Sequence, residues 1–110
     1  MNFIKQFNAF FERTEFAPIS GNAVLLWCTL FYIANRKRWP REFPVDNATL
    51  SMRSGLAIKP LQRARAELAR GGYIIYKKGY RRIAPPKYSM PVLYKCEQYE
   101  HYGGDSNDNM

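Results

Sequence analysis

The chain has 110 residues, enough for one domain with a modest hydrophobic core and too few for two. Hydrophobic residues make up 46% of the sequence, which excludes an intrinsically disordered chain, and two cysteines do not make a disulfide framework. The start lacks the pattern of a secretory signal peptide. The apolar stretch over residues 23–34 is too short to span a bilayer, which needs about 20 residues. We therefore expect a cytoplasmic protein that does not enter a membrane.

The first third of the chain predicts two helices. A helical stripe of phenylalanines opens the sequence, made by Phe3, Phe7, Phe10 and Phe11. A break is expected over residues 15–19, because Pro18 disfavours the helical conformation in the residue before it. Ser20 then caps a second helix that ends near residues 36–38 and is apolar on nearly every face. This helix is expected to be central, with four of its side chains in the core: Leu25, Trp27, Leu30 and Phe31.

The phenylalanine stripe has two interpretations. Phe3, Phe7, Phe10 and Phe11 either form the lid of the core or partly form a homodimer interface. Four phenylalanines are more than one short helix of a small core usually buries.

The remaining two thirds of the chain predict shorter elements. Residues 42–45 are expected to form an edge strand, and Asp46 or Asn47 to cap a short helix that ends at Gly55. Pro60 is predicted to open a further helix that runs to Arg70. The inner face of this helix consists of Leu61, Ala64 and Leu68. Residues 73–78 and 88–94 predict two strands, joined by a basic loop.

Two short helices separated by a tight turn and followed directly by a hairpin are typical of a winged helix-turn-helix. The spacing between residues 47–54 and 60–70 predicts a helix-turn-helix, and the hairpin adds a wing. The fold class is therefore expected to be α+β, a winged helix-turn-helix, mostly helical with a small β-hairpin. This winged-helix DNA-binding domain is assigned to residues 1–95. Residues 96–110 are polar and acidic and are expected to form a disordered tail.

The positive charge is concentrated in one block. Residues 53–87 hold ten Lys and Arg and a single acidic residue, Glu67, which suggests a surface that faces a polyanion such as double-stranded DNA. The predicted DNA-binding residues are Lys59, Gln62, Arg63, Ala66, Arg70, Lys77, Lys78, Arg81, Arg82 and Lys87. A secondary basic patch comprises Arg36, Lys37, Arg38, Arg41 and Arg53. Arg65 lies at the edge of the inner stripe, where a structural ion pair is the alternative to a DNA contact.

The run WPREFPVDNATLSMRSGL, the following LQRARAELARGGYI and the Lys-rich strand after it resemble a known family. They are similar to the N-terminal winged-helix domain of DnaD-like phage replication proteins, the replisome organisers. The opening MNFIKQFNAFFER fits the same pattern, so the resemblance covers about residues 1–95. It implies a domain that binds DNA or self-associates. In the family a further domain, which this sequence does not include, contacts DNA and host replication proteins, so the chain is either a fragment of such a protein or a stand-alone protein. A phage-encoded member acts in the bacterial cytoplasm.

Catalysis has little support in the sequence. The single histidine, His101, lies in the expected tail, and Cys28 and Cys96 lack a second pair of metal ligands. There is no phosphate-binding glycine motif. We therefore expect no enzyme activity, no metal and no cofactor. Beside a role in DNA replication initiation, two alternatives stay open: a protein-interaction or oligomerisation module, and a phage transcriptional regulator.

Overall fold

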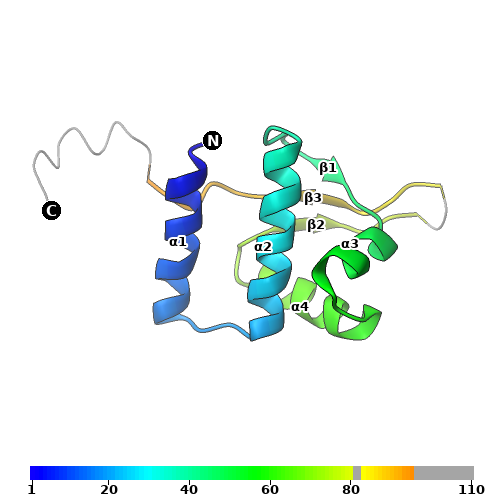
Figure 1. The fold of residues 1–110 in the computed structure, drawn as a ribbon, viewed down its shortest axis with the longest axis horizontal. Coiled ribbons are helices and arrows are strands. Elements are labelled where there is room, and N and C mark those ends of the chain that lie inside the picture. Colours follow the sequence, from blue (N-terminus) through cyan, green and yellow to red (C-terminus); the bar gives the residue numbers. More distant parts are fainter. Residues whose placement is uncertain (81–82, 96–110) are drawn as a thin grey trace, which may run out of the picture.

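The fold was obtained as a computed structural model, which describes residues 1–80 and 83–95. Within these residues the helices are α1 (Phe3–Phe16), α2 (Gly21–Arg36), α3 (Asn47–Ser54) and α4 (Ile58–Arg70). The strands β1 (Phe43–Pro44), β2 (Ile75–Lys77) and β3 (Lys87–Ser89) form an antiparallel sheet in the order β1-β3-β2. Figure 1 shows the sheet behind α2, with α1 on one side and α3 and α4 on the other. The predicted α+β winged-helix fold is confirmed.

The helix ends follow local signals that the sequence carries. The Ser20 hydroxyl accepts from the Ala23 N–H, and Asp46 rather than Asn47 caps α3, accepting from the Thr49 N–H. Gly55 ends α3 at φ 78°, a conformation that glycine adopts without strain. The predicted start of α4 at Pro60 is wrong, because the helix begins at Ile58. Pro60 still lies in the first turn, where a backbone N–H has no partner within the helix.

The strands are shorter than predicted. Tyr73 and Ile74 precede β2 and are buried in the core, and β3 ends at Ser89. Pro91 follows soon after and has no N–H to donate to a sheet. Beyond the strands the hairpin continues through the Tyr80 N–H, which donates to the Ala84 carbonyl. None of the helices within the described parts of the chain is long and apolar enough to cross a membrane.

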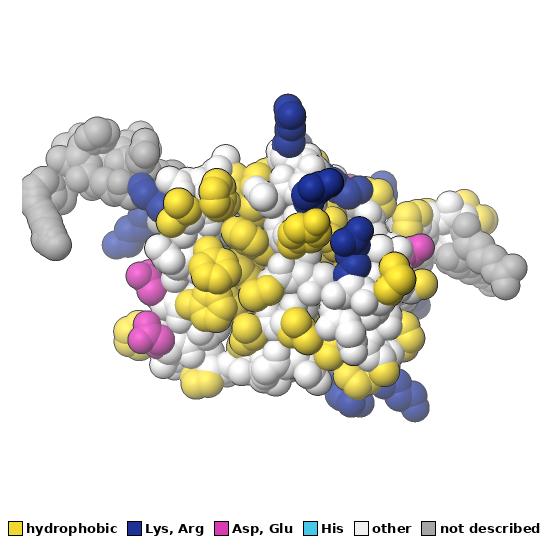
Figure 2. Space-filling model, in the orientation of Figure 1, with side chains coloured by type: hydrophobic (Ala, Val, Ile, Leu, Met, Phe, Trp, Pro, Cys, Tyr) yellow, Lys and Arg dark blue, Asp and Glu magenta, His cyan; other side chains and the backbone are white. Residues whose placement is uncertain are grey.

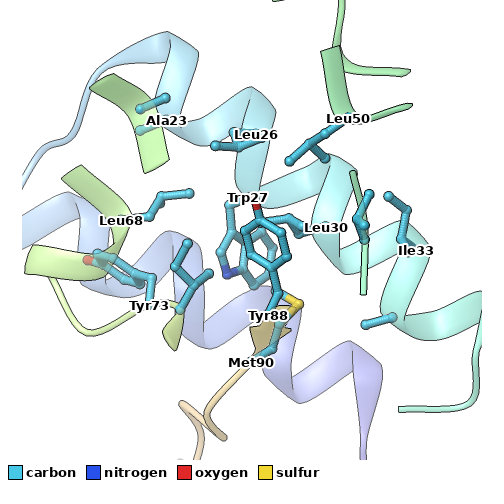
Figure 3. Close-up of a cluster of buried hydrophobic side chains, with 14 of the residues drawn as sticks. Ala23, Leu26, Trp27, Leu30, Ile33, Leu50, Leu68, Tyr73, Tyr88 and Met90 are labelled. Atoms are coloured by element: carbon cyan, nitrogen blue, oxygen red, sulfur yellow. The ribbon is translucent and has the colours of Figure 1, made fainter. Parts of the chain in front are cut away.

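The core is centred on α2. Figure 3 shows Leu26, Trp27 and Leu30 pointing toward side chains from α3, α4 and the sheet. Trp27, Leu30, Leu61 and Leu68 are fully buried, as predicted. Leu25 is instead 42% exposed, and Phe31 is half-buried. The reason is that α2 has one uncovered face between α1 and α3 (Figure 1), so an apolar helix is not buried all round.

Two buried residues of α1, Phe10 and Gln6, attach the helix to the core and to the segment after β3. The Phe10 ring stacks on Trp27 with a centroid distance of 3.8 Å. The buried Gln6 amide donates to the Pro91 carbonyl and accepts from the Leu93 N–H, both at 2.9 Å. Phe10 is fully buried, so its assignment to a homodimer interface is wrong. It belongs to the core.

A carboxylate of α4 is bound to the start of α2. Glu67 accepts hydrogen bonds from the Ser20 N–H at 2.8 Å and from the Ser20 hydroxyl at 2.6 Å. These bonds favour the ionised form and lower the pKa of Glu67. An anion at this position also interacts favourably with the positive end of the α2 dipole. The contact fixes the position of α4 relative to α2.

Candidate nucleic-acid interface

The helix α4 presents one basic face to solvent. Its opposite face packs against the core through Leu61, Ala64 and Leu68, all of which are buried. Because a helix turns once every 3.6 residues, the predicted contact residues fall on the outer side. All of these are exposed: Lys59, Gln62, Arg63, Ala66 and Arg70. The structure therefore places the predicted helical part of the site on one accessible surface.

Arg65 has a different position from these residues. Its side chain is buried, and its Nη1 donates to Asn47 Oδ1 at 2.9 Å and to the Tyr88 hydroxyl at 3.0 Å. The guanidinium also lies 4.1 Å from the centre of the Tyr76 ring. Arg65 is thus structural, but the partners described for it are neutral, so the predicted ion pair is wrong. It joins α3, α4 and the sheet.

The lysines of the hairpin face a single carboxylate. Lys77 and Lys87 are direct neighbours across β2 and β3, an arrangement in which like charges repel. The Glu42 carboxylate lies 3.0 Å from Lys77 Nζ and 4.0 Å from Lys87 Nζ. The hydrogen bond from Lys77 lowers the pKa of Glu42, so the carboxylate is ionised at neutral pH. Glu42 was absent from the predicted site, because nothing in the local sequence indicates this pairing.

The remaining predicted residues of the hairpin are Lys78, Arg81 and Arg82. Lys78 is exposed. Arg81 and Arg82 lie outside the described residues, so their assignment stays a prediction. Tyr80 and Ala84, which flank them, are joined in an antiparallel bridge.

The secondary basic patch separates into two parts. Arg36, Lys37 and Arg53 line one pocket, together with Tyr32. Arg38 and Arg41 line a different groove beside the sheet. Arg38 and the following Trp39 both have positive φ, 62° and 57°, which turns the chain sharply after α2 and separates the two parts. Figure 2 shows Lys and Arg side chains over the end of α2 and over α3, beside apolar side chains.

Comparison with known proteins identifies a solved structure of similar fold but does not assign the chain to a family. No family model matches the chain, and no curated protein matches it in sequence. A solved structure described as "Structure of Rep-DNA complex" is similar, with a TM-score of 0.59 and 14% identity. The match covers 88% of this chain and 82% of that chain. At this low identity the similarity is one of fold.

Proposed function

We propose that this chain is the DNA-binding winged-helix domain of a DnaD-like phage replication initiation protein. The helix α4 enters the major groove of duplex DNA, and the β2–β3 hairpin contacts the backbone beside it. The domain acts by binding and not by catalysis. Host replication proteins are partners of such a protein through a further domain.

The observation that carries this proposal is the outer face of α4. Lys59, Arg63 and Arg70 recur on one exposed side of a helix whose other side is fixed in the core. Lysines and arginines in this arrangement neutralise phosphates, and an Arg or Gln near the start of such a helix reads base edges. The similar fold described as a Rep–DNA complex supports DNA binding by this fold.

Replacement of Arg63 by alanine tests whether α4 reads bases. On a duplex site selected from a randomised pool, Arg63→Ala is expected to cost about 1–3 kcal/mol of binding free energy, because a bidentate contact to guanine is lost. On random duplex the loss is expected to be smaller. Fluorescence anisotropy titrations measure both. Lys95→Ala, which removes an exposed charge beside α1, is the matched control. Equal losses on both duplexes would assign Arg63 to the phosphate backbone.

Replacement of Glu42 by glutamine tests whether the lysines of the hairpin bind phosphates of the duplex. The carboxylate competes with phosphate for Lys77 and Lys87, so Glu42→Gln is expected to tighten duplex binding. Each additional phosphate contact steepens the dependence of log K on log salt by about 0.9, and two lysines would add about 1–2 units. Titration at several salt concentrations measures this slope. Glu12→Gln changes the net charge equally on α1, and the same steepening in that variant would contradict a specific release of the hairpin lysines.

A homodimer is the second part of the proposal. Phe3, Phe7 and Phe11 are 50%, 42% and 37% exposed on one side of α1, and the Phe7 and Phe11 rings are 4.9 Å apart. A second copy that covers these rings would double the number of phosphate contacts. Sedimentation equilibrium is expected to show a dimer that Phe7→Ser weakens. A monomer at high micromolar concentration would remove the dimer and leave DNA binding untouched.

A further inference from the structure

A basic pocket lies between the end of α2, the start of α3 and the hairpin. Its volume is about 440 Å³, within the range of pockets that hold small ligands. The charged residues Arg36, Lys37 and Arg53 line it, with Asp46 as the acidic member. Its apolar walls come from Ile33, Pro44, Val45 and Pro85. The pocket therefore combines a net positive charge with an apolar interior.

Tyr32 gives this pocket an aromatic surface. The tyrosine is 49% exposed, so its ring is accessible from solvent. The Arg53 guanidinium lies 5.9 Å from the centre of the ring, so a cation and an aromatic face are presented together. A ligand that fits must carry both an anionic group and a flat ring. Every nucleotide has both in one unit, whereas an acidic side chain of a peptide supplies only the charge.

The size of the pocket indicates that its ligand is single-stranded rather than duplex nucleic acid. A base within a duplex is stacked on both faces and paired at its edge, so it cannot enter a pocket of about 440 Å³. A base of a single strand is free to stack on an aromatic side chain while its phosphates contact basic residues. In Figure 2, the basic side chains over the end of α2 are well separated from those at the lower edge, where α4 lies. The pocket is thus separate from the outer face of α4.

We propose that Tyr32, Arg36 and Arg53 form a binding site for single-stranded nucleic acid, distinct from the duplex-binding surface of α4. A base stacks on Tyr32, and the adjacent phosphates are bound by Arg36 and Arg53. Asp46 adds a selective element. Hydrogen bonds from the Thr49 side chain and from the Thr49 N–H lower the pKa of its carboxyl group, so the carboxylate is ionised at neutral pH and can accept hydrogen bonds from amino groups. Cytosine presents such an amino group, and thymine does not.

The test uses the full chain and fluorescein-labelled single-stranded oligodeoxycytidylate about 8 nucleotides long, a length within the range of single-strand binding sites. Tyr32→Ala is expected to weaken its binding about 5- to 100-fold, the effect of removing one base–aromatic stack. Tyr32→Phe keeps the ring and is the matched control, expected to bind as the parent does. Duplex binding is measured in parallel and is expected to be unchanged by Tyr32→Ala. Circular dichroism melting checks that each variant folds.

Several outcomes would overturn the site. Equal oligonucleotide affinity for Tyr32→Ala and the parent would remove the stacking step. A loss with Arg63→Ala as large as that with Tyr32→Ala would place the single strand on α4. An oligoglutamate peptide of equal charge is used as a competitor. If it displaces the oligonucleotide equally well from the parent and from Tyr32→Ala, the surface recognises charge alone. If Tyr32→Ala fails to fold, the exposed Arg53→Gln replaces it and is expected to weaken oligonucleotide binding through the loss of a phosphate contact, with Lys95→Ala as the control for net charge. A different outcome separates the two proposals: oligonucleotide binding by the unsubstituted chain without duplex binding would contradict the proposed function of α4 and support this site.

Discussion

Phe10→Ala is expected to lower the free energy of unfolding by about 3–5 kcal/mol, the usual cost of removing a fully buried phenylalanine ring. Phe10 has no exposed surface, stacks on Trp27 and meets the edge of Tyr73 with a centroid distance of 5.1 Å. The variant leaves a cavity against the indole at the centre of the molecule. Equilibrium denaturation by urea, followed by tryptophan fluorescence and circular dichroism, measures the loss.

Phe3→Ala is the matched control for this prediction. It makes the same substitution on the same helix, but Phe3 is 50% exposed, so the expected cost is about 1 kcal/mol or less. Equal losses for the two variants would contradict the division of the phenylalanine stripe into one core residue and three surface residues.

Arg65→Ala is expected to lower the free energy of unfolding by about 3 kcal/mol, because two hydrogen bonds from a charged donor are lost and their acceptors, one buried and one half-buried, are left without that donor. The affected partners are Asn47 on α3 and Tyr88 on β3. The same variant removes the contact between the guanidinium and the Tyr76 ring. Thermal and chemical denaturation measure the change.

Two further variants isolate the role of Arg65. Arg63→Ala on the exposed side of the same helix is expected to change stability by about 0.5 kcal/mol or less. Arg65→Lys keeps the charge without the planar fork, so it is expected to restore only part of the loss. Unchanged stability of Arg65→Ala together with weakened DNA binding would return Arg65 to the DNA-contacting residues.

The sequence predicts those parts of the fold that depend on local chemistry. Ser20, Asp46 and Gly55 act within a few residues of their own positions, so the ends of α2 and α3 could be read directly. The exposure of Leu25 could not be predicted, because helical periodicity does not tell which faces of an apolar helix are covered by other elements. The path of residues 91–93 depends on hydrogen bonds with Gln6 from the far end of the chain, which no local pattern indicates.

The same distinction applies to the candidate site. The outer face of α4 follows from the spacing of Leu61, Ala64 and Leu68, and the structure places all predicted helical contact residues there. The pairing of Glu42 with two lysines depends on strand register, which the sequence leaves open. Tyr32 was missed because a tyrosine in an apolar helix is indistinguishable, by sequence, from a core residue.

The Gln6 contacts have a consequence for folding order. They join residues separated by 85 and 87 positions, and so close almost the whole chain into a loop. Such closure has a high entropic cost that is recovered only after the intervening helices and sheet have formed. We therefore expect the helix α1 and residues 91–93 to dock late and together. We also expect them to open together as one cooperative unit, and each such opening would expose the rings of Phe10 and Trp27 to water.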